Sequence, residues 1–312
     1  MSSNHTAKTA FLFPGQGSQF PGMGKSLAAA FPVVRQTFEE ADEALGFALS
    51  TLCFVGPEDQ LKQTENTQPA LVAVSTAAFR VLTEKGLTPD YVAGHSLGEY
   101  SALVAAGSLG FADALRLVRK RGSYMQQAVL AGVGAMAALL KLPEDKLAGV
   151  LAEAAQGEVV EAANLNSPDQ IVISGDVAAV NRACELAKAA GAKRAILLPV
   201  SAPFHCSLMK SAQLRLAADL DATAFAPLTV PMVNNWQARV VTSGDDARKG
   251  LFEQVPNAVR WAESVRLLAS LGVVRTIEVG AGAVLTGLLR NIQPEMQGWK
   301  FGEAADWEKL PA

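Results

Sequence analysis

The chain has 312 residues, half of them hydrophobic, with 27 basic and 30 acidic side chains. This length supports one large domain or two unequal ones around a sizeable core. The nearly balanced charge gives no electrostatic footprint for nucleic acid or an anionic membrane, so neither partner is expected. No apolar run approaches the roughly 18 residues of a membrane span, and the N-terminus lacks the pattern of a signal peptide. We therefore expect a cytoplasmic protein.

Cysteine and histidine are scarce. The chain contains three residues of each type: Cys53, Cys184, Cys206, His5, His95 and His205. The cysteines form no CxxC pair, and an odd, sparse count argues against both a disulfide framework and a zinc site. We expect no metal or other cofactor. His5 lies in a polar N-terminal tail, so any histidine chemistry must come from His95 or His205.

The first part of the chain alternates between strand and helix patterns. Short buried strands are predicted at 9–13 and 91–94, and helices at 25–46, 67–86, 96–107 and 111–129. Gly86 is expected to end the second of these helices. Such alternation is typical of a parallel sheet covered by helices.

The pattern changes over residues 130–200, where the predicted order is β-α-β-β-α-β. This order indicates a ferredoxin-like small domain, inserted into a larger α/β domain formed by residues 1–129 and 201–312. The larger domain resumes with strands near 229–233 and 274–279 and helices near 258–271 and 282–292.

Ser96 is the candidate nucleophile. The segment VAGHSLGEY places G-x-S-x-G between a predicted strand and a predicted helix, which is the context of a nucleophile elbow. The helix N-terminus would supply N–H groups to a developing oxyanion. A helix-capping serine in a glycine-flanked turn is the alternative.

His205 is the candidate base, by elimination. His95 adjoins Ser96 in the chain, so its ring is expected to point away from the serine hydroxyl. His205 lies in the proline-containing segment PVSAPFHCSLM, which reads as a loop of the kind that often carries catalytic groups. We interpret Cys206 as structural. No Asp stands out to orient the histidine, and a backbone carbonyl could do so.

At two further positions, the sequence pattern leaves two interpretations open. The turn FPGQG after the first strand is either an ordinary connection or one that presents the Gln16 N–H to an oxyanion. Arg121 falls on the apolar face of the helix at 111–129. A buried guanidinium needs an anion, which would be either a structural carboxylate or the carboxylate of a substrate.

Together these segments resemble the malonyl-CoA:acyl-carrier-protein transacylase family, along essentially the whole chain. The matching motifs stand in family order: FPGQGSQ at 13–19, GHSLGEY at 94–100, NLNSPDQIVISG at 164–175, PFH at 203–205 and EVGAGAVLTGLL at 278–289. The resemblance implies an α/β-hydrolase-like domain with a ferredoxin-like insert. It also implies malonyl transfer from malonyl-CoA to acyl carrier protein.

The resemblance assigns roles residue by residue. Ser96 is similar to the family's nucleophile, His205 to its base and Arg121 to the clamp for the malonyl carboxylate. The backbone N–H groups of Gln16 and Leu97 resemble its oxyanion hole. Two other positions carry implied roles: the Gln254 carbonyl orients the histidine, and Phe204 favours malonyl over methylmalonyl units.

Some positions depart from the family pattern, and rival functions share its motifs. The departures are Ala202, Cys206, Ala281 and Ala283. The rivals are the malonyl-transferring subunit of a malonate decarboxylase, a serine esterase or thioesterase, and a non-catalytic carrier-binding module. The GQGSQ turn and the missing Asp argue against the esterase, and the intact Ser, His and Arg set argues against the non-catalytic module.

Overall fold

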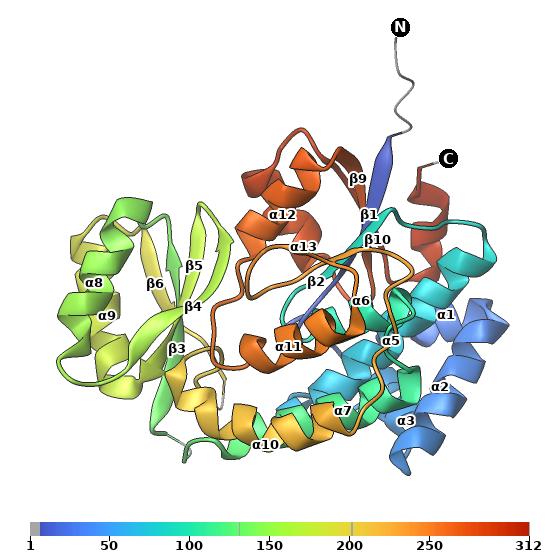
Figure 1. Ribbon diagram of the computed structural model, residues 1–312, viewed down its shortest axis with the longest axis horizontal. Coiled ribbons are helices and arrows are strands. Elements are labelled where there is room, and N and C mark those ends of the chain that lie inside the picture. The colour runs from blue at the N-terminus through green and yellow to red at the C-terminus, as the bar shows by residue number, and fades with distance from the viewer. Residues whose placement is uncertain (1–6, 131, 201, 312) are drawn as a thin grey trace, which may run out of the picture.

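The computed structural model describes residues 7–130, 132–200 and 202–311, so His5 lies outside the described residues. Two separate sheets organise them (Figure 1). The larger sheet has the strand order β10-β9-β1-β2-β7-β8. Its strands are β1 (Lys8–Phe13), β2 (Tyr91–Gly94), β7 (Met232–Val233), β8 (Val240–Val241), β9 (Val273–Val279) and β10 (Gln297–Phe301). All its pairs are parallel except β7 with β8.

Helices cover both faces of the larger sheet. Alternate residues of β1 point to opposite faces, so Phe11 and Phe13 join one core while Ala10 and Leu12 join another. The first core includes α1 (Lys25–Ala30), α2 (Pro32–Leu45), α3 (Leu49–Phe54), α4 (Glu58–Leu61), α5 (Thr64–Glu84), α6 (Gly98–Ala105), α7 (Phe111–Gln127), α10 (Lys210–Asp221) and α11 (Gly244–Gln254). The second includes α12 (Trp261–Ser270) and α13 (Val284–Ile292).

The smaller sheet is antiparallel, with the order β4-β5-β3-β6. Its elements follow the predicted β-α-β-β-α-β succession: β3 (Gly134–Leu140), α8 (Leu147–Ala155), β4 (Val160–Ser167), β5 (Gln170–Asp176), α9 (Val177–Ala189) and β6 (Arg194–Leu197). Helices α8 and α9 pack on the sheet around a core of their own. This lobe lies to the left of the larger body in Figure 1. The α/β class with a ferredoxin-like small unit is confirmed.

Several predicted boundaries need correction. The single helix expected at 25–46 is two helices, because Phe31 is extended (φ −126°, ψ 122°) ahead of Pro32. The helix expected at 67–86 begins at Thr64, and Gly86 follows it with φ 81° as predicted. Helices α10 and α11 were not predicted. Short 3₁₀ turns also occur at Glu144–Lys146, Ser207–Met209 and Ala304–Lys309.

Membrane-spanning helices were not expected. Among the described residues, no helix combines the length and the apolar character needed to cross a bilayer.

Candidate active site

Ser96 lies in a sharp turn between β2 and α6. Its φ of 49° is left-handed, a strained conformation for a residue with a side chain. The flanking glycines allow the turn: a Cβ on Gly94 would lie 1.9 Å from the Gly98 carbonyl carbon, and one on Gly98 would lie 2.0 Å from the Phe13 oxygen. The G-x-S-x-G segment therefore has the geometry expected of a nucleophile elbow.

His205 lies against the serine. Its Nε2 is 2.6 Å from Ser96 Oγ, and its Nδ1 is 3.0 Å from the main-chain oxygen of Gln254. With the Nδ1–H donated to that carbonyl, Nε2 is left to accept the serine proton. The ring is 4% exposed. Burial, and then the charge of Arg121, lower the pKa of His205 to about 3, so the imidazole is neutral in the free protein and its Nε2 carries no proton.

His95 and Cys206 are engaged elsewhere. His95 Nε2 is 2.7 Å from Asn166 Oδ1, and the ring meets Trp261 edge to face. Cys206 is fully buried, with its Sγ 3.2 Å from the Pro203 oxygen. Burial raises the pKa of this thiol to about 11. A thiol that stays protonated is a poor nucleophile, in agreement with the structural interpretation.

Arg121 reaches the same site from α7 and is 2% exposed. Its Nη1 donates to Gln68 Oε1 at 2.8 Å, and its Nη2 donates to Gln254 Oε1 at 2.9 Å and to Ser96 Oγ at 3.2 Å. These partners in the described residues are uncharged, and its Nε has none there. No ion pair of the described residues includes Arg121, so the alternative of a structural carboxylate pair finds no support.

Gln16 and Leu97 follow the ends of the neighbouring strands β1 and β2 and line the same cavity as Ser96. β1 and β2 are adjacent and parallel, with Phe13 opposite Gly94, so the segments that follow them meet. Within the described part of the chain, neither backbone N–H donates a hydrogen bond. The N–H of Ser96 is already donated to Asn235 Oδ1 at 2.6 Å. Of the backbone N–H groups of Gln16, Ser96 and Leu97, those of Gln16 and Leu97 therefore stay free among the described residues. These are the two that the resemblance assigns to an oxyanion hole.

A cavity of about 120 Å³ joins these groups. Apolar side chains form much of its wall, and Phe204 is among them. Its lining is Gln16, Gln68, His95, Ser96, Leu97, Arg121, Met125, Met136, Asn164, Leu198, Val200, Phe204 and His205. Every predicted site residue thus lies in or against one cavity, since Gln254 contacts both His205 and Arg121.

Sequence reasoning missed three polar residues of the site: Gln68, Glu99 and Asn235. Gln68 holds Arg121, while Glu99 and Asn235 hydrogen-bond to each other beneath the Ser96 turn. Gln68 and Glu99 lie on helices whose neighbouring residues are mostly buried. A polar residue at such a core-facing position is unusual, and this was the signal that could have identified them. Asn235 lies in a loop and carried no such signal.

A serine at a strand–turn–helix elbow, a histidine on its hydroxyl and free N–H groups beside it define the class of serine-dependent acyl-transferring enzymes. Comparison with known families is in accord: residues 10–298 match the acyl transferase domain family. The chain belongs to that family.

Two relatives are similar along nearly their full lengths. The malonyl CoA-acyl carrier protein transacylase of Escherichia coli (strain K12) is 51% identical over 284 residues, which cover 91% of this chain and 92% of that protein. The protein of the same name from Bacillus subtilis (strain 168) is 49% identical over 292 residues, covering 93% and 92%.

Two solved structures are similarly close. An acyl carrier protein S-malonyltransferase from Vibrio cholerae has a TM-score of 0.96 at 47% identity, covering 98% of this chain and 100% of that one. The malonyl-transacylase PlMCAT, solved in complex with the type II PKS acyl-carrier protein AntF, has a TM-score of 0.95 at 46% identity, covering 97% and 98%.

Proposed function

We propose that this chain transfers a malonyl group from malonyl-CoA to the phosphopantetheine thiol of an acyl carrier protein, through a malonyl ester of Ser96. The observation that carries the proposal is the buried guanidinium of Arg121 within 3.2 Å of the Ser96 hydroxyl, in a cavity where His205 contacts the same oxygen. The names and high identity of the relatives support the same reaction.

The reaction proceeds in two half-reactions. His205 Nε2 takes the hydroxyl proton as Ser96 Oγ attacks the thioester carbonyl of malonyl-CoA. The N–H groups of Gln16 and Leu97 stabilise the tetrahedral oxyanion. Its collapse breaks the carbon–sulfur bond, and His205 returns the proton to the CoA thiolate. In the second half, His205 takes the proton of the carrier thiol and the sulfur attacks the carbonyl of the malonyl ester. Collapse of this second tetrahedral intermediate breaks the ester carbon–oxygen bond, and His205 returns the proton to Ser96 Oγ.

Two residues of the cavity select the acyl group. The malonyl carboxylate would accept paired hydrogen bonds from the planar guanidinium of Arg121, an arrangement that carboxylates favour. Phe204 is 8% exposed and lines the same cavity, where it would restrict space for a methyl branch. The main-chain carbonyl of Gln254 orients His205, a role that an Asp side chain fills in many esterases.

The sequence and the fold also support a domain division and a location. We propose that residues 130–200 form an inserted domain, because the small sheet lies within this span and has its own core. The remaining residues form the catalytic domain. The three cysteines are all buried and free, as in proteins of a reducing compartment, which supports the cytoplasm as the location.

The test is intact-protein mass spectrometry with malonyl-CoA alone, followed by holo-carrier protein or buffer. One malonyl mass should appear on the wild-type chain and none on Ser96→Ala. The labelled chain should lose that mass much faster with the carrier than in buffer. A mass on another residue would refute Ser96, and equal loss in buffer would favour an esterase.

A further inference from the structure

A fully buried carboxyl lies directly beneath the Ser96 turn. Glu99 stands in the first turn of α6 and is 0% exposed. Its Oε2 accepts hydrogen bonds from Gln254 Nε2 at 2.8 Å and from the Asn235 backbone N–H at 3.0 Å. Its Oε1 has no partner in the described residues. Burying a carboxyl is costly, and the mechanism above assigns this one no task.

We propose that Glu99 is a positioning residue for acyl transfer, whose single accepting oxygen fixes both the residue that orients His205 and the loop that holds the Ser96 backbone. The inference rests on the proposed function, since it concerns the same serine and histidine. Glu99 itself does not line the cavity, so it acts through Gln254 and Asn235.

The first of these links runs to His205. The side-chain Nε2 of Gln254 donates to Glu99 Oε2 and, at 2.9 Å, to the main-chain oxygen of Ser96. The Oε1 of the same side chain accepts from Arg121. A flipped amide would turn its NH₂ group toward the guanidinium, placing donor against donor. The carboxyl on the NH₂ side and Arg121 on the Oε1 side together fix the amide orientation, and with it the residue whose main-chain oxygen accepts from His205 Nδ1.

The second link runs to the serine. The Asn235 side chain spans the left-handed turn: its Oδ1 accepts from the Ser96 N–H and its Nδ2 donates to the Gly94 oxygen, both at 2.6 Å. The backbone N–H of the same residue donates to Glu99. Strain at Ser96 persists because its surroundings hold it, and Asn235 is the part of those surroundings that Glu99 holds.

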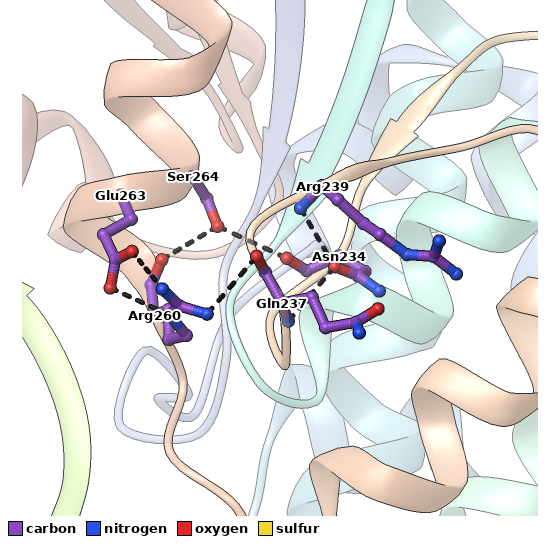
Figure 2. Close-up of polar contacts among 6 residues, drawn as sticks. All are labelled: Asn234, Gln237, Arg239, Arg260, Glu263 and Ser264. Carbon is purple, nitrogen blue, oxygen red and sulfur yellow. Dashed lines mark hydrogen bonds and ion pairs between the residues drawn. The ribbon is translucent and has the colours of Figure 1, made fainter.

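The loop of Asn235 is anchored from its other side as well. Figure 2 shows the turn formed by residues 234–239. Asn234 Oδ1 accepts from the Arg239 backbone N–H at 3.2 Å, and Ser264 Oγ donates to the main-chain oxygen of Asn234 at 3.4 Å. The backbone N–H of Arg260 donates to the main-chain oxygen of Asn235 at 3.0 Å. The outer side of the loop is thus tied to the start of α12, and its inner side depends on Glu99.

The charged and titratable neighbours of Glu99 are Arg121 and Tyr100. Burial raises the pKa of Glu99 to about 7, and the hydrogen bonds from Gln254 and Asn235 and the charge of Arg121 oppose that rise. Burial raises the pKa of Tyr100 to about 12. An assay near pH 8 therefore compares an ionised carboxylate with its substitutes.

Two variants of similar volume separate the accepting oxygen from everything else. In Glu99→Gln the amide oxygen can replace Oε2, and the amide nitrogen then replaces the unpartnered Oε1. Glu99→Met removes the acceptor. Single-turnover acylation by malonyl-CoA near pH 8 should fall at least about 100-fold in Glu99→Met, the cost of a slightly misplaced reacting group. It should stay within about tenfold of wild type in Glu99→Gln.

A second readout reports the histidine directly. The hydrogen-bonded Nδ1–H proton of His205 should give a downfield NMR resonance in wild type and in Glu99→Gln, and lose it in Glu99→Met. Glu278→Met is the matched control. Glu278 is also 0% exposed and accepts N–H bonds from Leu285 and Thr286, but it does not line the cavity. Its folded variant should acylate at the wild-type rate.

The outcomes are distinct. A wild-type protein that takes no malonyl group defeats the proposed function itself. Wild-type rates in Glu99→Met, or an equal loss in the control, overturn only the positioning role. So do equal losses in Glu99→Gln and Glu99→Met, which would assign the effect to charge. If Glu99→Met does not fold, a loss beyond about tenfold in folded Glu99→Gln overturns the inference, and retention within tenfold supports it.

Discussion

At the scale of single residues, the proposed role of His205 as a base is combined with an environment that resists protonation. The ring is buried, and the Arg121 guanidinium adds a positive charge nearby. Both effects disfavour the imidazolium, which the proposed mechanism forms transiently in each half-reaction. A malonyl carboxylate on Arg121 would offset that charge, so the substrate would ease the protonation of the base that it requires.

The depressed pKa of His205 has a consequence for stability. With a folded pKa of about 3 against about 6.5 unfolded, the unfolded chain binds the proton first as pH falls. Stability is therefore lost below pH ~6.5. From about pH 7.5 to about pH 5.5, wild type should lose about 1 kcal/mol more unfolding free energy than His205→Gln. Urea unfolding at both pH values measures this, and parallel losses would show that the histidine titrates normally.

Arg121 should govern which acyl group is taken. Losing one partner of a buried charged pair costs on the order of 2–5 kcal/mol, so Arg121→Ala should cripple malonyl transfer. Acetyl-CoA lacks the carboxylate and leaves the guanidinium unpaired, so its transfer should be kept or should rise. The measurement is kcat/KM for both substrates. Arg119→Ala, on the same helix, is the control, since Arg119 contacts Phe47 and Asn66 instead. Proportional loss of both activities in Arg121→Ala would mean a structural role.

At the scale of elements, the approach of α7 to α5 sets the depth of Arg121. Gly122 follows that arginine, and a Cβ there would lie 2.8 Å from both Glu65 Cα and the Thr64 oxygen. The two helices therefore meet through backbone, and Gln68 of α5 can hold the Arg121 guanidinium.

Gly122→Ala should consequently force the helices apart and cost about 1–3 kcal/mol of stability, as overpacking does. Gly149→Ala is the matched control, because this α8 glycine has no atom within 4 Å of its ideal Cβ. That change should be neutral or stabilise by up to about 1 kcal/mol, the usual helix preference for alanine. Chemical denaturation compares the two, and equal effects would contradict the close approach.

At the scale of the whole molecule, the site gathers segments from distant parts of the chain. Gln16 and Ser96 follow adjacent parallel strands, so the larger sheet brings them together. His205 enters after the small sheet has been completed, and Gln254 arrives at the end of α11. Met136, Leu198 and Val200, at or near the ends of the small-sheet strands, add to the cavity wall. The wall of the proposed substrate cavity therefore depends on both sheets.

The sequence by itself determined those features that short-range patterns encode. Strand and helix periodicity predicted the α/β class and the insert, G-x-S-x-G predicted the elbow, and helical spacing predicted the burial of Arg121. Counting histidines selected His205, and the family resemblance indicated Gln254, whose carbonyl does lie on His205. The domain boundaries and the residue roles stay predictions.

Only the tertiary structure decided how polar groups pair beneath the site. Glu99 meets Gln254 across 155 positions, and Asn235 reaches Ser96 across 139. No local pattern records such partners, because a buried polar side chain is satisfied by whatever the fold places against it. The same holds for Arg121. Helical spacing predicted that it lies on the apolar face of its helix, but the sequence did not predict its uncharged partners. Among the described residues no carboxylate forms an ion pair with that guanidinium, which leaves this place to the proposed substrate carboxylate.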